Sequence, residues 1–153
     1  MGWATADLTA MRAALAEASH ALAAGEIPVG AVVVIDGKVT GAGHNRSLAD
    51  HDPTAHAEIV ALRAAAAARG NHRLTTATAY VTLEPCLMCM AAFAQARVAR
   101  IVFGAYDPKA GAAGSAIDLA ESAALNHHPE INGGLLAEEC GRLLNTFFAA
   151  LRA

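Results

Sequence analysis

The sequence contains few cysteines, few charged residues and no long apolar run, and each shortage excludes a class of protein. Three cysteines in 153 residues do not make the paired framework of a small secreted disulfide protein. No run of about eighteen large apolar residues is present, so we expect no membrane-spanning helix. The amphipathic N-terminal segment, which carries Asp7 and Glu17, lacks the layout of a signal peptide. We therefore expect a cytoplasmic protein with no membrane partner.

An excess of positive charge is also missing. The formal net charge is −3 and only 16% of residues are charged, which argues against a protein that holds long nucleic acid by charge alone. Hydrophobic residues make up 55% of the chain, a composition that excludes a disordered protein. The length suits one buried core, and no repeat or linker interrupts it. We expect a single domain over residues 1–153.

Hydrophobic periodicity and turn residues predict an α/β fold. We expect helices over 6–24, 53–69, 86–97, about 117–125 and 135–151, and strands over 29–35, 38–43, 79–83, 98–104 and about 130–132. Asp36-Gly37, between the first two strands, is a strong hairpin signal. The third and fourth strands are separated by a helix, which indicates a parallel βαβ unit. Ligand sites in such sheets favour the edge where the strands end.

His56, Cys86 and Cys89 carry the ligands of a zinc site with one open position. Zinc prefers thiolate and imidazole ligands, and three protein ligands leave the fourth position to water. Cys86 and Cys89 are three residues apart, so both can reach one ion from a helical turn. His56 and Glu58 would diverge by about 200° within a helix. We therefore expect the ion at the first turns of two helices, where the helix dipole favours thiolates.

Proline and capping residues predict where these two helices begin. Pro85 fits the first position of the helix that carries the cysteines. Asp52 or Thr54 can cap the other helix, with Pro53 in its opening turn.

Glu58 would lie beside the metal-bound water without binding the metal. The ion acidifies that water, and the carboxylate can accept its proton, pass it to a ring nitrogen of the substrate and help the amine leave. His-x-Glu followed by Pro-Cys-x-x-Cys is the signature of zinc-dependent nucleobase deaminases. We therefore predict hydrolytic deamination with Glu58 as the catalytic residue.

Two other interpretations of the cysteine pair stay open. Cys-x-x-Cys can be a redox motif or half of a closed structural zinc site, and a closed site needs a fourth protein ligand such as Cys140. A redox pair has no need of His56 and Glu58, and Cys140 stands where a small buried apolar side chain is expected. A closed site would make the protein a non-catalytic RNA-binding or interaction module, in which Glu58→Ala has no effect.

Beyond the metal motif, the chain resembles the bacterial tRNA-specific adenosine deaminases, which have a cytidine-deaminase-like fold. The resemblance extends over 27–32, 44–46, 51–59, 81–86, 103–115, 126–127 and 136–140. The zinc motif alone is shared with cytosine, guanine and deoxycytidylate deaminases. The resemblance implies a three-layer α-β-α sandwich with a mixed five-stranded sheet, a homodimer and one catalytic zinc per subunit. It also implies a tRNA anticodon stem-loop as partner, with conversion of the wobble adenosine to inosine.

The same resemblance implies the residues that bind the substrate. Asn45 would hold the flipped adenine or its ribose, and Val29 and Ala57 would line the pocket. The residues expected to meet the anticodon loop are Asp107, Lys109, Asn126, His127, Phe147 and Phe148. Several have simpler explanations: Asn45 and Asp107 can form turns, His127 and Lys109 can be solvated surface residues, and one phenylalanine of the pair can belong to the core. The alternative substrate is a free nucleobase or nucleoside such as guanine, cytosine or adenosine, which the acidic net charge favours.

Overall fold

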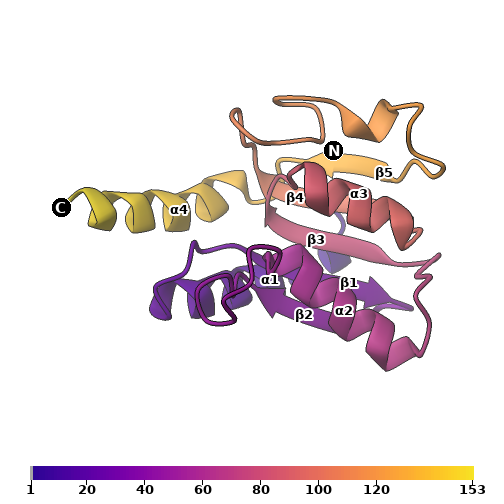
Figure 1. The fold of residues 1–153 in the computed structure, drawn as a ribbon, viewed down its shortest axis with the longest axis horizontal. Helices are drawn as coiled ribbons and strands as arrows, with labels where there is room; N and C mark the ends of the chain where they lie inside the picture. The colour runs from indigo at the N-terminus through magenta and orange to yellow at the C-terminus, as the bar shows by residue number, and fades with distance from the viewer. Residues whose placement is uncertain (1) are drawn as a thin grey trace.

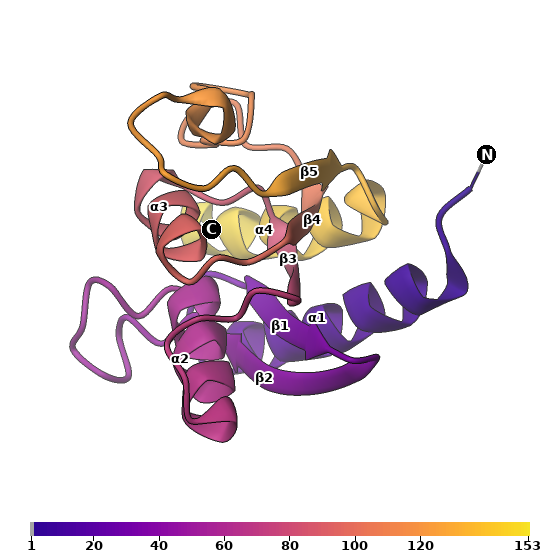
Figure 2. The same ribbon diagram turned by 90° about the vertical axis from the view of Figure 1, so that its right-hand side faces the viewer.

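A five-stranded sheet lies between two layers of helices in the computed structural model, which describes residues 2–153 (Figures 1 and 2). In chain order the elements are α1 (Thr5–Ala23), β1 (Gly30–Ile35), β2 (Lys38–His44), α2 (Ala57–Arg69), β3 (Thr78–Leu83), α3 (Leu87–Gln95), β4 (Arg100–Ala105), the short 3₁₀ helix η1 (Leu119–Glu121), β5 (Glu130–Gly133) and α4 (Ala137–Arg152). The arrangement is the predicted three-layer α/β fold.

The sheet is mixed, with the strand order β2-β1-β3-β4-β5. β1 is antiparallel to β2 and β3, whereas β3, β4 and β5 are parallel. The predicted hairpin is confirmed, because Asp36 and Gly37 take the positive φ values of 52° and 74° that a tight β-turn of this type requires. The predicted parallel unit β3-α3-β4 is also confirmed. The start of β1 and the ends of β2, β3 and β4 therefore meet at one edge of the sheet.

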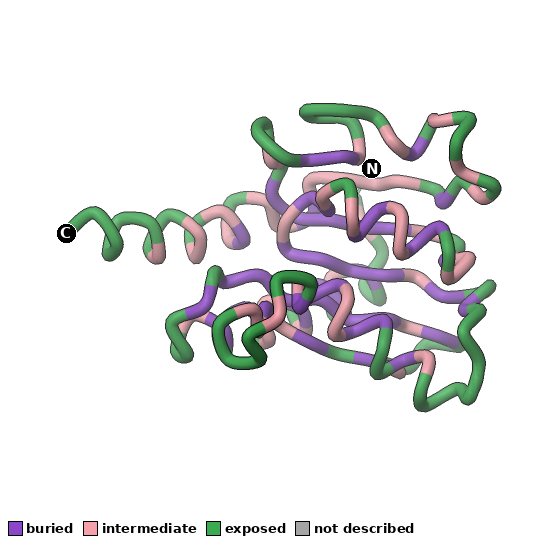
Figure 3. Tube along the Cα trace, viewed as in Figure 1, coloured by how far each residue is buried: buried purple, intermediate pink, exposed green. Residues whose placement is uncertain are grey.

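Alternate residues of the central strands point into two separate cores. α2 and α3 cover one face of the sheet and α1 and α4 cover the other, with α2 and α1 on opposite sides in Figure 2. The period of two along a strand explains why adjacent residues serve different cores. Large buried residues of the α2/α3 core are Val33, Val81, Met90, Phe93 and Ile101, and those of the α1/α4 core are Met11, Val32, Tyr80, Val102 and Leu135. Figure 3 shows the central strands β1, β3 and β4 as the most continuously buried part of the chain.

Both helices of the predicted metal site begin later than predicted. α2 starts at Ala57 rather than near residue 53, because Asp52 Oδ1 accepts hydrogen bonds from the Thr54 backbone N–H at 2.8 Å and hydroxyl at 2.7 Å. This local turn uses the carboxylate that we expected to cap the helix. α3 starts at Leu87, so Pro85 lies before the helix and not in its first turn. The predicted helix over 117–125 is reduced to η1.

α4 extends past the end of the sheet (Figure 1), and its outer turns are largely exposed (Figure 3). The expectation that one residue of the Phe147–Phe148 pair is core is therefore wrong. Phe147 is half-buried and Phe148 is 39% exposed, and their rings pack edge to face with centroids 5.3 Å apart. Among residues 2–153, no helix has both the length and the apolar character needed to cross a membrane.

Candidate active site

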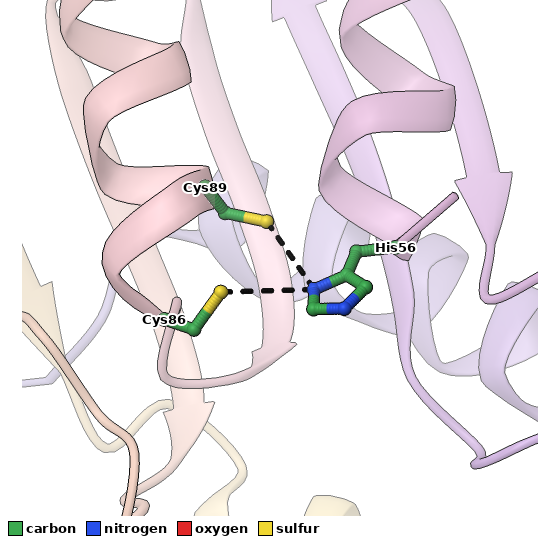
Figure 4. Close-up of side chains that lie close together, drawn as sticks. All are labelled: His56, Cys86 and Cys89. Carbon is green, nitrogen blue, oxygen red and sulfur yellow. Dashed lines mark hydrogen bonds between the residues drawn. The ribbon is translucent and has the colours of Figure 1, made fainter. Parts of the chain in front are cut away.

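The structure brings His56, Cys86 and Cys89 together with a geometry that suits one zinc ion (Figure 4). His56 Nδ1 lies 3.6 Å from the sulfur of each cysteine. In a tetrahedral site with Zn–S bonds of about 2.3 Å and Zn–N bonds of about 2.05 Å, a sulfur and a nitrogen ligand are about 3.6 Å apart. The observed spacing therefore matches ligands of a shared ion. Both cysteines are free thiols, which excludes a disulfide between them in this structure.

The three donors lie where two helices begin, as the sequence predicted. His56 and Cys86 are the cap residues of α2 and α3, and both have extended backbone conformations. Cys89 follows in the first turn of α3. Because each cap residue has left the helical path, its side chain turns across the helix end and not along the helix surface. The positive ends of two helix dipoles consequently point at the site, where they favour thiolates.

Hydrogen bonds among the donors set their protonation. The hydrogen bond from the Cys89 thiol lowers the pKa of Cys86, and the hydrogen bond with His56 lowers it further. The same contact with Cys86 raises the pKa of His56. Cys86 is thus poised as the thiolate, which is the form that binds zinc.

Glu58 is buried beside these donors and contributes none of the three metal-binding atoms. It stands at the second position of α2 and is 4% exposed. Burial raises the pKa of Glu58 to about 7, because a carboxylate loses hydration in an enclosed site. A carboxyl group with a pKa near neutrality can both accept and donate a proton under physiological conditions.

Cys140 belongs to a different part of the molecule. It lies on α4 in the α1/α4 core, where it is 1% exposed, and burial raises its pKa to about 11. Its sulfur packs against Gly104, where any side chain would collide with it. The group of possible metal ligands around His56 contains only three of the described residues. A closed site with Cys140 as the fourth ligand is therefore not supported, and the site keeps an open position.

A pocket of about 170 Å³ opens beside the donors. Pockets for drug-sized ligands measure about 300–1,000 Å³, so this one suits a smaller group such as a single base. The sequence analysis placed Val29, Asn45 and Ala57 here, and all three line the pocket together with His56, Glu58 and Cys86. Asp107, which was expected to meet the anticodon loop, lines the pocket as well. The lining residues that the sequence analysis missed are Ile27, Leu83, Glu84 and Ala110.

Asn45 both forms a turn and faces the pocket. Its side-chain oxygen accepts hydrogen bonds from the Ser47 backbone N–H at 3.2 Å and hydroxyl at 2.8 Å. Its backbone N–H donates to the Val29 carbonyl at 3.2 Å. The side-chain amide nitrogen makes no hydrogen bond to any residue in 2–153 and is left with two donors. The turn therefore fixes the side chain and leaves an amide that can bind a ligand.

Glu84 holds the glycine-rich segment that closes one side of the pocket. Its carboxylate is 2% exposed and accepts hydrogen bonds from the backbone N–H groups of Asp107 (3.0 Å), Ala113 (3.0 Å) and Ser115 (3.1 Å), and from the Ser115 hydroxyl. A side chain at Gly111 would collide with this carboxylate. In the sequence, the only indication of this role is that Glu84 directly follows a buried strand. Its hydrogen-bond partners are more than twenty residues away along the chain, so the sequence does not reveal them.

Glu26 has the same role for the loop that follows the pocket residue Asn45. This carboxylate is 2% exposed and accepts hydrogen bonds from the backbone N–H groups of Leu48 (3.1 Å) and Ala49 (2.8 Å). Two buried acids thus shape two loops that adjoin the pocket, and neither was found from the sequence.

The pocket continues into a groove of about 580 Å³ between the 106–110 segment and α4. Ile27, Leu83, Asp107 and Ala110 line both spaces. The groove has two exposed aromatic rings, Tyr106 at 57% and Phe148 at 39%. The other groove residues are Lys109, Leu144, Asn145 and Arg152. Sequence reasoning named Lys109 and Phe148 but not Tyr106, and Phe147 does not line the groove.

Asn126 and His127 lie away from this site. The His127 Nε2 atom is 2.7 Å from the carbonyl oxygen of Val98, which precedes the start of β4. That position is the edge of the sheet opposite the pocket. Asn126 is exposed next to it. Within one subunit, Asn126 and His127 therefore do not line the groove.

Comparisons with known proteins agree with this geometry. Residues 4–105 match the family described as the cytidine and deoxycytidylate deaminase zinc-binding region. A tRNA-specific adenosine deaminase of Haemophilus influenzae is 50% identical over 147 residues, covering 95% of this chain and 85% of the relative. One from Bacillus subtilis is 44% identical, covering 97% and 92%.

A solved structure from a study of A-to-I editing by tRNA:A34 deaminases at the wobble position superimposes with a TM-score of 0.87. It is 43% identical, and the match covers 89% of this chain and 99% of that one. The fold, the His/Cys/Cys cluster and these relatives together show that the chain belongs to the zinc-binding cytidine and deoxycytidylate deaminase family.

Proposed function

We propose that the protein is a zinc-dependent tRNA adenosine deaminase that converts adenosine to inosine at the wobble position of an anticodon loop. The observation that carries the substrate assignment is the groove that continues from the pocket. A free base would need only the space of about 170 Å³, whereas the groove beside it presents Tyr106 and Phe148 together with Lys109 and Arg152. Exposed aromatic rings stack on unpaired bases, and nearby cations favour the phosphate backbone.

The proposed roles at the metal site follow from the geometry. His56, Cys86 and Cys89 would hold one zinc per subunit, and when bound the ion would acidify a water molecule toward neutral pH. Glu58, buried beside these donors, would take one proton from the attacking water and deliver it to the ring nitrogen, and would then carry the remaining hydroxyl proton to the leaving amine. The proposed reaction consumes water and releases ammonia.

The proposed roles in substrate binding follow the lining of the two spaces. Val29 and Ala57 would contact the faces of the flipped adenine, and the amide of Asn45 would hydrogen bond to the base or its ribose. Asp107 and Lys109 would contact the neighbouring nucleotides in the groove, with Phe148 as the stacking residue and Phe147 as its packing partner. Binding by Asn126 and His127 stays a prediction that the groove does not support.

The decisive experiment compares polymer and free-base substrates. Purified zinc-loaded protein is incubated with an arginine tRNA anticodon stem-loop and, separately, with adenosine, guanine and cytosine, while inosine and ammonia are measured. We expect turnover of the stem-loop. Turnover of free bases alone would refute the tRNA assignment and support the alternative substrate class.

A second experiment separates an enzyme from a non-catalytic zinc module. Glu58→Gln keeps the size of the side chain and removes its ability to carry the proton. We expect loss of nearly all turnover, with zinc content and thermal unfolding close to wild type. Glu121→Gln, at an exposed position of η1, is the matched control and should retain full activity. Full activity of Glu58→Gln would contradict the proposed mechanism.

We further propose a single deaminase domain over 1–153, a homodimer and a cytoplasmic location. All five strands form one sheet, which supports the single domain. A partly apolar hollow of about 430 Å³ between α2 and α3 supports the dimer, because a second copy that filled it would cover the part of this apolar lining that solvent still reaches. Its apolar lining residues are Leu62, Ala66, Leu74, Ala92 and Ala96. Sedimentation equilibrium measures the assembly, and a monomer at micromolar concentration would contradict it.

A further inference from the structure

A second group of metal-binding side chains lies on the α1 side of the sheet. It consists of Glu17 and His20 on α1 and His44 at the end of β2. The donor atoms of these three residues all lie within 4.8 Å of one another. We propose that they bind a second divalent transition-metal ion, of the class of zinc, copper or nickel, distinct from the ion of the active site.

The backbone places the three residues together. Glu17 and His20 are three residues apart on α1 and therefore share a face of that helix. His44 pairs with Gly30 across β1 and β2. A Cβ atom at Gly30 would collide with the backbone of Ala14 in α1, so glycine is what lets the helix approach this pair of strands. That close approach sets α1 directly above His44.

The contacts within the cluster already resemble those of a ligand set. His44 Nδ1 is 2.9 Å from Glu17 Oε1, and the side chains of His44 and Glu17 are 20% and 25% exposed. The His20 and His44 rings meet edge to face, with centroids 6.0 Å apart and an interplanar angle of 78°. Ligands at bonds of about 2.0–2.1 Å around a tetrahedral ion are about 3.3 Å apart. Because His20 is exposed, a small rotation of its side chain can complete that geometry.

The chemistry of the donors selects the class of ion. Two imidazoles and one carboxylate form a ligand set that zinc uses at sites with an open position. Imidazole donors favour zinc, copper and nickel, whereas magnesium and calcium prefer oxygen ligands. Unlike the site at His56, this cluster contains no thiolate, so we expect its affinity for zinc to be lower. Ions should therefore fill the active site first and the cluster second.

The competing explanation is a simple hydrogen bond between Glu17 and His44, in which His20 has no part. The two explanations differ in the effect of His20→Ala. This exposed helical position accepts alanine without loss of helix propensity, so the variant should fold. His51→Ala removes another exposed histidine and serves as the matched control.

The test uses tag-free protein that carries one zinc per protomer, titrated with Ni²⁺ and with Zn²⁺. Calorimetry measures binding, and metal analysis after desalting gives the stoichiometry. We expect wild type and His51→Ala to bind one additional ion per protomer and to show a rise in Tm with added metal, because an ion that binds the folded state stabilises it. His20→Ala and Glu17→Gln should lose both effects.

Equal binding by wild type and His20→Ala would overturn the proposal, and so would the absence of an additional ion in wild type. The readouts are stoichiometry and Tm, so they do not depend on the substrate or on turnover. A loss of binding in His51→Ala equal to that in His20→Ala would show non-specific histidine binding and would also refute the site.

Discussion

Replacing Glu84 by glutamine tests how the glycine-rich segment supports substrate binding. The carboxylate accepts four hydrogen bonds, two of which come from the backbone N–H groups of Ala113 and Ser115 to its Oε2 atom. In Glu84→Gln, an amide NH₂ in place of Oε2 would face these two donors without accepting from them. A hydrogen bond to a charged group contributes about 1.5–3 kcal/mol. Two lost bonds therefore give roughly 3–6 kcal/mol.

Part of this penalty is relieved because the segment lies at the surface and water can reach the freed N–H groups. We expect about 2–3 kcal/mol to remain as the cost of ordering the segment when RNA binds. At about 1.4 kcal/mol per tenfold change, kcat/KM for the anticodon stem-loop should fall by about 30- to 150-fold. The loss should appear mainly in KM, because the segment lines the groove and Glu84 moves no proton.

The assay is steady-state inosine formation, with zinc content and thermal unfolding measured on the same samples. Glu121→Gln again serves as the control for removal of a carboxylate. A kcat/KM within twofold of wild type in a folded Glu84→Gln protein would refute the reasoning. A fall in kcat at constant KM would show instead that Glu84 acts on the reacting groups.

Three further predictions concern stability, stacking and the metal. Asp7→Asn should lower the free energy of unfolding by about 2–3 kcal/mol at pH 7 in urea titrations, because it removes the nearer and more buried of the two carboxylates that pair with Arg100, at 2.9 Å, and leaves only the exposed Glu130 at 3.6 Å. Burial by itself would raise the pKa of Asp7, but hydrogen bonds from Arg100 and Tyr80 outweigh it and lower that pKa. Its stabilising effect is therefore complete above the usual pKa of an aspartate and is lost as the pH falls through the lowered value, so the variant and wild type should converge in acid. Phe148→Ala should raise KM for the stem-loop by about 5- to 150-fold in the inosine assay, since stacking of a base contributes about 1–3 kcal/mol. An unchanged KM would show that Phe148 does not contact the RNA. Cys89→Ala should lose zinc and activity, whereas Cys140→Ala should keep zinc by metal analysis; zinc loss in both would favour a four-ligand site.

The metal donors could be predicted from the sequence because ligand chemistry depends on residue type and local spacing. His56, Cys86 and Cys89 are recognisable without knowing the fold, and the hairpin at Asp36-Gly37 follows from turn chemistry alone. The pocket residues Asn45 and Asp107 were found through family resemblance, since each also makes an ordinary turn.

Other features depend on contacts between distant segments, which a sequence does not display. Glu84 looks like a polar residue at a strand end until its partners beyond residue 106 are in place. Asp52 or Thr54 was expected to cap α2, but the two form a local turn with each other, and the helix starts at Ala57, four residues after the predicted start. Neither Phe147 nor Phe148 is a core residue, because α4 extends beyond the sheet, and helical periodicity alone does not predict that extension.

The position of the donors at the first residues of α2 and α3 affects how this protein tolerates change. The positions of the three donor atoms depend on the length of the segment that leads into each helix. They depend little on which residues occupy the exposed faces of the helices that follow. We expect the exposed alanines of α2, which are Ala64, Ala67 and Ala68, to accept many substitutions, whereas its buried alanines belong to the core. One residue inserted between Cys86 and Cys89 would instead turn the second sulfur by about 100° around the helix axis. Substitutions can therefore accumulate on the exposed faces of these helices, whereas insertions and deletions near the helix starts should be removed by selection.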